Sequence, residues 1–157
     1  MTLINTGIEC ERVRVFLSKM DDNSLRYDEV AAKPLYAPFK RAVRKGKMRI
    51  EYTCLFDSPQ HYRDRKGWTM LDRHSEFAYS VRKVFLNDLR SQPLQTEKTI
   101  VLLENRRWAI THGWSEDGIM EHPMLLVRRD AFESLRRQYM CIRSHSYAYR
   151  GRRTEAK

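Results

Sequence analysis

The sequence has few of the residues on which common catalytic motifs depend. Its three cysteines, Cys10, Cys54 and Cys141, lie far apart and form no CxxC pair. We therefore expect no disulfide framework, and reduced thiols that act as small apolar residues. The six glycines stand singly and no GxSxG sequence is present, which excludes glycine-rich phosphate loops and the usual setting of a nucleophilic serine. The sequence predicts no cofactor, and no motif supports an enzymatic activity.

Long apolar stretches are also absent. The longest, such as residues 100–103 and 124–127, have four residues, whereas a helix needs about 20 to cross a bilayer. The first 20 residues carry Glu9, Glu11 and two arginines within their apolar pattern, which fits neither a secretory signal nor a transit peptide. We expect an intracellular, cytoplasmic protein with no membrane partner.

The sequence does contain enough apolar residues for a core. Hydrophobic residues make up 41% of the 157 residues and aromatic residues 11%, which is too rich for a disordered chain even with 32% charged residues. A chain of this length forms one compact domain or two small units that share an interface. The spacing of the apolar residues predicts an α+β fold.

Positive charge is concentrated in two blocks. The chain has 30 Lys+Arg and 20 Asp+Glu, for a net charge of +10, and residues 40–66 and 128–157 each carry a net charge of +6. Two local excesses of positive charge can lie on one face of the fold, bind a polyanion there and release its counterions. Arginine outnumbers lysine by 21 to 9, and its planar fork matches phosphate and base edges. The charge distribution therefore favours nucleic acid as a partner.

Three helices followed by a hairpin are predicted in the first part of the chain. Thr6 and Glu9 have the spacing of a capping box, and apolar residues recur at helical spacing as far as Met20. The alternation Arg12-Val13-Arg14-Val15 also fits a strand, but the cap and the length favour a helix. The expected elements are helices at 7–20, 25–32 and 38–45, a strand at 47–53, a basic loop at 57–66 and a strand at 67–71.

This order of elements, together with the position of the charge, resembles a winged helix-turn-helix over residues 7–71. The resemblance implies that helix 38–45 is the recognition helix. Its outer face carries Lys40, Arg41, Arg44 and Lys45. The basic loop then forms the tip of the hairpin, with Tyr62 as the aromatic side chain that faces a partner.

The remainder of the chain predicts a helix, a small antiparallel sheet and a second helix. The helices are expected at 74–90 and 130–142, and the strands at 100–103, 108–111 and 124–127. The predicted units are thus residues 1–73 and 74–142, which form two domains or one, followed by a basic, flexible tail at 143–157. Aromatic residues alternate with arginine in this tail, a pattern that single-stranded nucleic acid can use.

Two sets of side chains have the chemistry of metal ligands. Cys141 and His145 are four residues apart, and with His112 and His122 they make a zinc site geometrically feasible. Four carboxylates around Lys66, of the kind that a metal-dependent nuclease uses, lie near one another in sequence: Asp57, Asp64, Asp72 and Glu76. No tight ligand pair and no nuclease signature supports either set, so we interpret them as surface, capping and loop residues and predict no metal site.

The first functional hypothesis is a protein that binds DNA or RNA through two basic surfaces. A regulatory role is one option within this hypothesis. Helix 38–45 and the loop at 61–66 form one surface in this hypothesis, and the C-terminal helix and tail form the second. The predicted binding residues are Lys40, Arg41, Arg44, Lys45, Tyr62, Arg63, Arg65, Lys66, Arg136, Arg137, Arg143, Arg150, Arg152 and Arg153.

Two other hypotheses belong to different classes. A protein-binding inhibitor or adaptor could dock the same basic face on an acidic protein partner, and the small size and absence of catalytic motifs fit it. A metal-dependent nuclease ranks below both, because it depends on the carboxylates and histidines above. The oligomeric state and the choice between DNA and RNA stay open at this stage.

Overall fold

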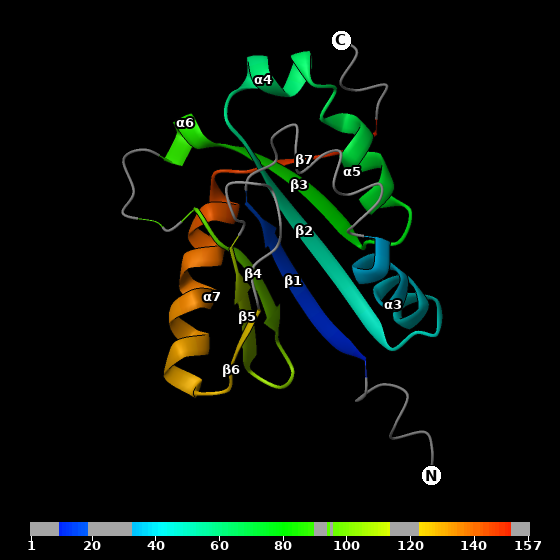
Figure 1. Cartoon of the computed structure of the whole chain (residues 1–157), viewed down its shortest axis with the longest axis vertical. Helices are drawn as coiled ribbons and strands as arrows, with labels where there is room; N and C mark the ends of the chain where they lie inside the picture. The colour runs from blue at the N-terminus through cyan, green and yellow to red at the C-terminus, as the bar shows by residue number, and fades with distance from the viewer. Residues whose placement is uncertain (1–9, 19–32, 90–93, 95, 114–122, 152–157) are drawn as a thin grey trace.

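The computed structural model describes residues 10–18, 33–89, 94, 96–113 and 123–151, with only the backbone described for 33–38. Their main feature is one sheet of seven strands in the order β6-β5-β4-β1-β2-β3-β7 (Figure 1). The strands are β1 (Glu11–Leu17), β2 (Met48–Phe56), β3 (Ser80–Phe85), β4 (Thr99–Leu103), β5 (Trp108–His112), β6 (Met124–Leu126) and β7 (Tyr147–Ala148). The helices are α3 (Lys33–Arg44), α4 (Pro59–Asp64), α5 (Trp68–Ser75), α6 (Leu86–Leu89) and α7 (Arg129–Ser144).

The sheet is mixed. The strands β1, β2 and β3 are parallel, while β4, β5 and β6 form an antiparallel meander beside β1, and β7 pairs antiparallel with β3. Parallel neighbours need a crossover connection, and α3 connects β1 to β2 while α4 and α5 connect β2 to β3. Strands β1 and β2 come from residues 1–73, and β3 to β6 come from residues 74–142.

The predicted N-terminal unit of three helices and a hairpin is wrong. Residues 11–17 of the predicted first helix form β1, and the predicted second strand at 67–71 falls mainly in α5. Strand β2 pairs in parallel with β1 and β3, so it belongs to no hairpin. The predicted basic loop contains α4. These elements exclude a winged helix over the described residues of 7–71; the predicted helix at 25–32 lies outside the described residues.

Strands buried on both faces explain the largest errors. In β1, Val13 and Val15 are buried on one face and Phe16 on the other. The predicted helix at 74–90 contains the end of α5, β3 and α6, and β3 likewise buries Val81 and Val84 on opposite faces. A strand covered on both sides need not keep a period of two along its whole length. In β1 the alternation of residues 12–15 ends at Phe16, and the apolar residues of such a strand can also match helical spacing by coincidence.

Other predicted elements are confirmed. Helix α3 covers the predicted helix at 38–45 but begins five residues earlier, and Gly46, at φ 72°, follows its end as a left-handed glycine. The predicted strand at 47–53 corresponds to β2, the hairpin to β4 and β5, the third run to β6, and the helix at 130–142 to α7. The predicted tail differs, because its residues 147–148 form β7 and pair with β3.

Helices cover both faces of the sheet (Figure 1). On one face, which we call the α3–α5 face, Ile50, Tyr52 and Phe56 of β2 pack with Tyr62 of α4 and Leu71 of α5. On the other, the α7 face, Phe132, Tyr139 and Ile142 of α7 pack on Phe16 and Leu102. Within the described ranges the longest helix has 16 residues, and none is long and apolar enough to span a membrane.

One glycine, Gly67, lies against two aromatic rings of the α3–α5 face. A Cβ atom at Gly67 would lie 2.5 Å from Cδ1 of Tyr62 and 2.6 Å from Cε1 of Phe56. These two rings pack edge to face, with centroids 4.7 Å apart. A methyl group can therefore fit only if the rings move.

We expect Gly67→Ala to lower the free energy of unfolding by about 1–3 kcal/mol, the usual cost of an overpacked core. Each kcal/mol lowers the melting temperature by about 2–4 °C in a chain of this size. Thermal denaturation followed by circular dichroism measures the change. Thr69→Ala, at an exposed position in α5, is the control, and an unchanged melting temperature for Gly67→Ala would contradict this account of the packing.

Candidate functional site

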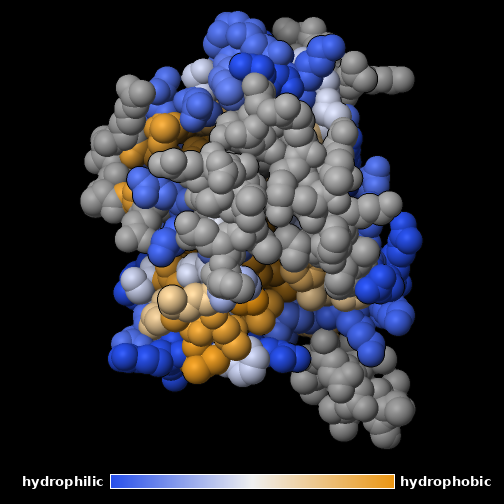
Figure 2. Space-filling view, viewed as in Figure 1, coloured by the Kyte–Doolittle hydropathy of each residue, from blue (hydrophilic) through white to orange (hydrophobic). Residues whose placement is uncertain are grey.

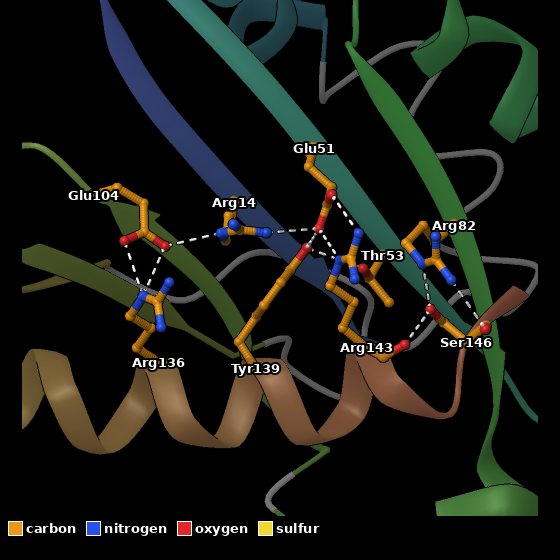
Figure 3. Close-up of polar contacts among 9 residues, drawn as sticks. All are labelled: Arg14, Glu51, Thr53, Arg82, Glu104, Arg136, Tyr139, Arg143 and Ser146. Atoms are coloured by element: carbon orange, nitrogen blue, oxygen red, sulfur yellow. Dashed lines mark hydrogen bonds and ion pairs between the residues drawn. The ribbon is translucent and has the colours of Figure 1, made fainter. Parts of the chain in front are cut away.

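A buried carboxylate joins α7 to the sheet. The Glu51 side chain, on the α7 face of β2, is only 7% exposed. It accepts hydrogen bonds from Arg143 Nε at 2.8 Å, Tyr139 Oη at 2.9 Å and Arg14 Nη1 at 3.1 Å (Figure 3). A buried charge needs such partners to offset its lost hydration. Glu51 thus fixes the position of two α7 residues against β1 and β2.

The network extends through Arg14 to a second carboxylate. Arg14 Nε donates to Glu104 at 2.9 Å, and Arg136 Nε donates to the same carboxylate at 3.0 Å (Figure 3). Three arginines and two glutamates therefore alternate across α7, β1, β2 and the end of β4. Thr53 Oγ1 lies 2.9 Å from Tyr139 Oη and completes the contacts of that hydroxyl.

The ionisation states in this network are well defined. Burial alone would raise the pKa of Glu51, but hydrogen bonds from Arg143 and Tyr139 and the charges of Arg143 and Arg14 outweigh it and lower the pKa. Burial and the Glu51 charge raise the pKa of Tyr139. The hydrogen bond to Glu51 raises the pKa of Arg143. At neutral pH the network is a fixed set of ion pairs around a protonated tyrosine, and its function is to hold α7 on the sheet.

A second group of cations lies where the parallel strands begin. Helix α3 ends at Arg44, the chain turns through residues 45–47, and β2 begins at Met48. The carbonyl of Lys47 accepts a hydrogen bond from the amide of Glu11, at the start of β1, at 2.8 Å. The cations on this edge form what we call the amino-edge patch: Arg12, Arg41, Arg44, Lys45, Lys47 and Arg49.

The amino-edge patch is unbalanced in charge. All six side chains are exposed, and none forms an ion pair with a carboxylate of the described residues. The nearest acidic residue along β1, Glu11, is occupied, because Arg106 Nε lies 3.2 Å from one of its oxygens and the Asn105 amide donates to the other. Six positive charges therefore face solvent without a local counter-ion from that part of the chain.

Two of these arginines border a cavity on the α7 face. The cavity has a volume of about 300 Å³ and is lined by Arg12, Val13, Arg14, Arg49, Glu51 and Tyr79. We call it the arginine cavity. Arg12 and Arg49 are direct neighbours in the β1–β2 register, a placement that is unfavourable for like charges. The Arg49 guanidinium stacks over the Tyr79 ring, 3.8 Å from its centroid.

An anion in this cavity would remove that repulsion. Guanidinium groups form charge-assisted, forked hydrogen bonds with phosphate and carboxylate. Arg14 is less available, since Glu51 and Glu104 already accept from it. The arrangement therefore suits an external anion held by Arg12 and Arg49.

The structure separates the residues predicted to form one basic surface. Arg41, Arg44 and Lys45 lie in the amino-edge patch, and Lys40 beside them pairs with Glu76 at 3.3 Å. Residues 63–66 follow β2 and lie at its other end, where Arg63, Arg65 and Lys66 are exposed. The nine residues of β2 place about 26 Å between the two groups.

Tyr62 is not an exposed loop residue. It is 2% exposed and packs among Phe56, Trp68 and Phe85, with Lys83 Nζ 4.5 Å from its ring centroid. The prediction that it faces a partner is wrong, because residues 59–64 form a helix whose apolar side turns toward the core. Trp68 is partly buried in the same cluster.

The predicted C-terminal residues fall into different settings. Arg136 and Arg143 belong to the network around Glu51 and Glu104, whereas Arg137 and Arg150 are exposed. Arg152 and Arg153 lie outside the described residues. Sequence reasoning missed Arg12, Lys47 and Arg49 as candidates. The sequence did contain a signal for Arg12. If residues 12–15 are interpreted as a strand, the alternation with Val13 and Val15 puts Arg12 and Arg14 on the same face.

The two sets of side chains with the chemistry of metal ligands do not come together in the described residues. No group of three or more such side chains comes together there, and His122 lies outside them. Asp64 accepts from Gln60, Glu76 pairs with Lys40, and Asp72 accepts from Tyr149 Oη. These carboxylates therefore serve separate local contacts.

The described surface has separate hydrophilic and apolar regions. Hydrophilic side chains cover α4 and the end of α3, while exposed apolar residues gather over β5 and β6 (Figure 2). Met124, Leu125 and Val127 are each more than half exposed.

No protein-family model matches the chain, and no curated protein is significantly similar to it in sequence. The site must therefore be interpreted from its own geometry.

Proposed function

We propose that this protein binds nucleic acid through the amino-edge patch, with backbone phosphates as the primary ligands. The observation that carries the proposal is the set of six exposed cations without ion pairs to described carboxylates, two of which are neighbouring arginines at a cavity. An intracellular location, where nucleic acids occur, is part of this proposal.

Several features support a polyanion over a single small anion. The six cations extend from the end of α3 to the starts of β1 and β2, so they can contact more than one phosphate. Neutralising each phosphate releases condensed counterions, which makes binding favourable and sensitive to salt. Among the other predicted binding residues, Arg136 and Arg143 pair with Glu104 and Glu51, and residues 63–66 lie at the other end of β2. These residues therefore do not extend the amino-edge patch.

The test is fluorescence anisotropy of the purified, nuclease-treated protein with labelled single-stranded DNA, single-stranded RNA and duplex DNA. If four of the six cations contact phosphates of a single strand, the affinity should fall about 50-fold between 50 and 200 mM salt. A steep slope of this kind, with saturation at micromolar or lower protein concentration, is the expected result.

A labelled polyglutamate peptide of similar length is the matched control for charge alone. Nucleic acid should bind more tightly than this peptide, because phosphates accept forked hydrogen bonds at regular spacing along the backbone. Absence of nucleic-acid binding at 50 mM salt would overturn the proposal. Tighter binding of the peptide would instead favour an acidic protein partner.

A further inference from the structure

A second cavity adjoins the arginine cavity at the start of β3. It has a volume of about 400 Å³, and its lining includes Asp72, Ser75, Tyr79, Ser80 and Arg150. We call it the β3–β7 cavity because Val81 and Ala148, from those two strands, also line it. Tyr79 lines both cavities, so it lies where the two meet.

Tyr79 is an exposed aromatic residue held in a fixed place. It is 64% exposed, and an exposed tyrosine ring can stack on a base. Its backbone amide donates to the carbonyl of Ile50 at 2.7 Å, which ties it to β2. The Arg49 guanidinium stacks on the ring. The ring and the guanidinium together offer a flat π surface beside the exposed Arg12.

Cations flank this platform in both cavities. Arg12 and Arg49 line the first. Arg150 lines the second, where it is exposed and forms no ion pair within the described part of the chain. The one carboxylate in that lining, Asp72, already accepts a hydrogen bond from Tyr149 Oη. The arginine cavity therefore carries an excess of positive charge, and Arg150 places one further exposed cation at the second cavity.

We infer that the nucleic acid is single-stranded, with a base stacked on Tyr79 and flanking phosphates at Arg12 and Arg49 on one side and at Arg150 on the other. This inference rests on the proposed function. Exposed aromatic residues within a basic groove are the usual platform for unpaired bases. In a duplex the faces of the bases are covered by their neighbours, so Tyr79 would contribute nothing.

The positions of the cavities favour a single strand for a second reason. The arginine cavity lies on the α7 face, whereas the β3–β7 cavity is lined by Asp72 and Ser75 of α5, from the opposite side of the sheet. A ligand that occupies both must turn around the start of β3. Duplex DNA is stiff over about 150 base pairs and cannot follow this turn, whereas a flexible strand can.

The experiment compares Tyr79→Leu with Tyr79→Phe on three labelled probes: a 20-nucleotide thymidine strand, an abasic strand of the same length, and a 20-base-pair duplex. Tyr147→Leu is the control, because Tyr147 is also exposed, at 53%, but lines neither cavity. We expect Tyr79→Leu to weaken thymidine-strand binding about tenfold, as loss of one stacked base does. Tyr79→Phe and Tyr147→Leu should change it less than twofold.

The probes separate stacking from charge. The abasic strand keeps the phosphates, so Tyr79→Leu should bind it as the unsubstituted protein does, and the salt dependence should be unchanged. Equal weakening on all three probes, or no effect on the thymidine strand, would overturn the inference while leaving nucleic-acid binding intact. Preferential binding of the duplex by the unsubstituted protein would overturn it too. Binding of no probe at all would overturn the proposed function itself.

Discussion

Replacing Arg12 and Arg49 together by glutamine is expected to weaken binding of a single-stranded oligonucleotide about 25-fold at 0.1 M salt. Each phosphate contact on a single strand contributes about 0.7 to the slope of log K against log salt concentration. The double substitution removes two contacts, so the slope should also fall by about 1.4. Fluorescence anisotropy at four salt concentrations measures both quantities.

The matched control is the double substitution Arg63→Gln and Lys66→Gln. It removes the same charge from the opposite end of β2, so it separates a local contact from the effect of net charge. We expect less than a threefold loss of affinity from this control. Equal losses from the two double variants would show that only total charge matters and would remove the amino-edge patch as the binding site. Unchanged melting temperatures would verify that both variants fold.

Glu51→Gln is expected to lower the free energy of unfolding by about 3 kcal/mol. The change removes the carboxylate that accepts from Arg143, Tyr139 and Arg14, and leaves charged groups without their counter-ion. Breaking a buried ion pair costs about 3–5 kcal/mol, and the lower figure applies because the arginines are themselves partly exposed. The melting temperature should fall by about 6–12 °C. Glu97→Gln, at an exposed position, is the control.

The ionisation of Glu51 also makes the free energy of unfolding depend on pH. Because the pKa of Glu51 is lower in the folded protein than its ordinary value of 4.5, folding favours the ionised form. Its contribution is fully present above pH 4.5 and is lost as the pH falls through the lower folded pKa. The stability difference between the unsubstituted protein and Glu51→Gln should therefore be constant from pH 8 to about pH 6 and shrink in acid. A difference that grows below pH 4 would contradict the ion-pair assignment.

Local patterns predicted the elements whose two sides differ. The stripe of Phe132, Tyr139 and Ile142 identified α7 because one side of that helix packs on the sheet and the other is exposed. The same reasoning found the β4–β5 hairpin, where the pairing partner is close in sequence. It failed for β1 and β3, which are buried on both faces and pair with strands that lie far away in the sequence.

The site could be predicted only in part, for a related reason. Arg41, Arg44 and Lys45 were identified from the outer face of a helix, which is a local pattern. The pairing of Arg12 with Arg49 depends on the parallel β1–β2 register, which no local pattern contains. Glu51 alternates with Arg49 and Thr53 along β2, and three polar residues at this spacing are typical of an exposed face. That face is buried beneath α7 instead, so Glu51 and Thr53 are buried and only Arg49 is exposed.

The central position of β1 has a consequence for how the chain folds. One neighbour of β1 is β2, and the other is β4, whose end is about 90 residues away, the separation of Arg14 and Glu104. Contacts between such distant segments make folding slow, because a long loop must close before the contacts form. During synthesis, β1 therefore keeps an unpaired edge, and Phe16 an uncovered ring, until residues 99–103 and α7 are available. A fragment that ends before residue 99 is expected to aggregate through that edge.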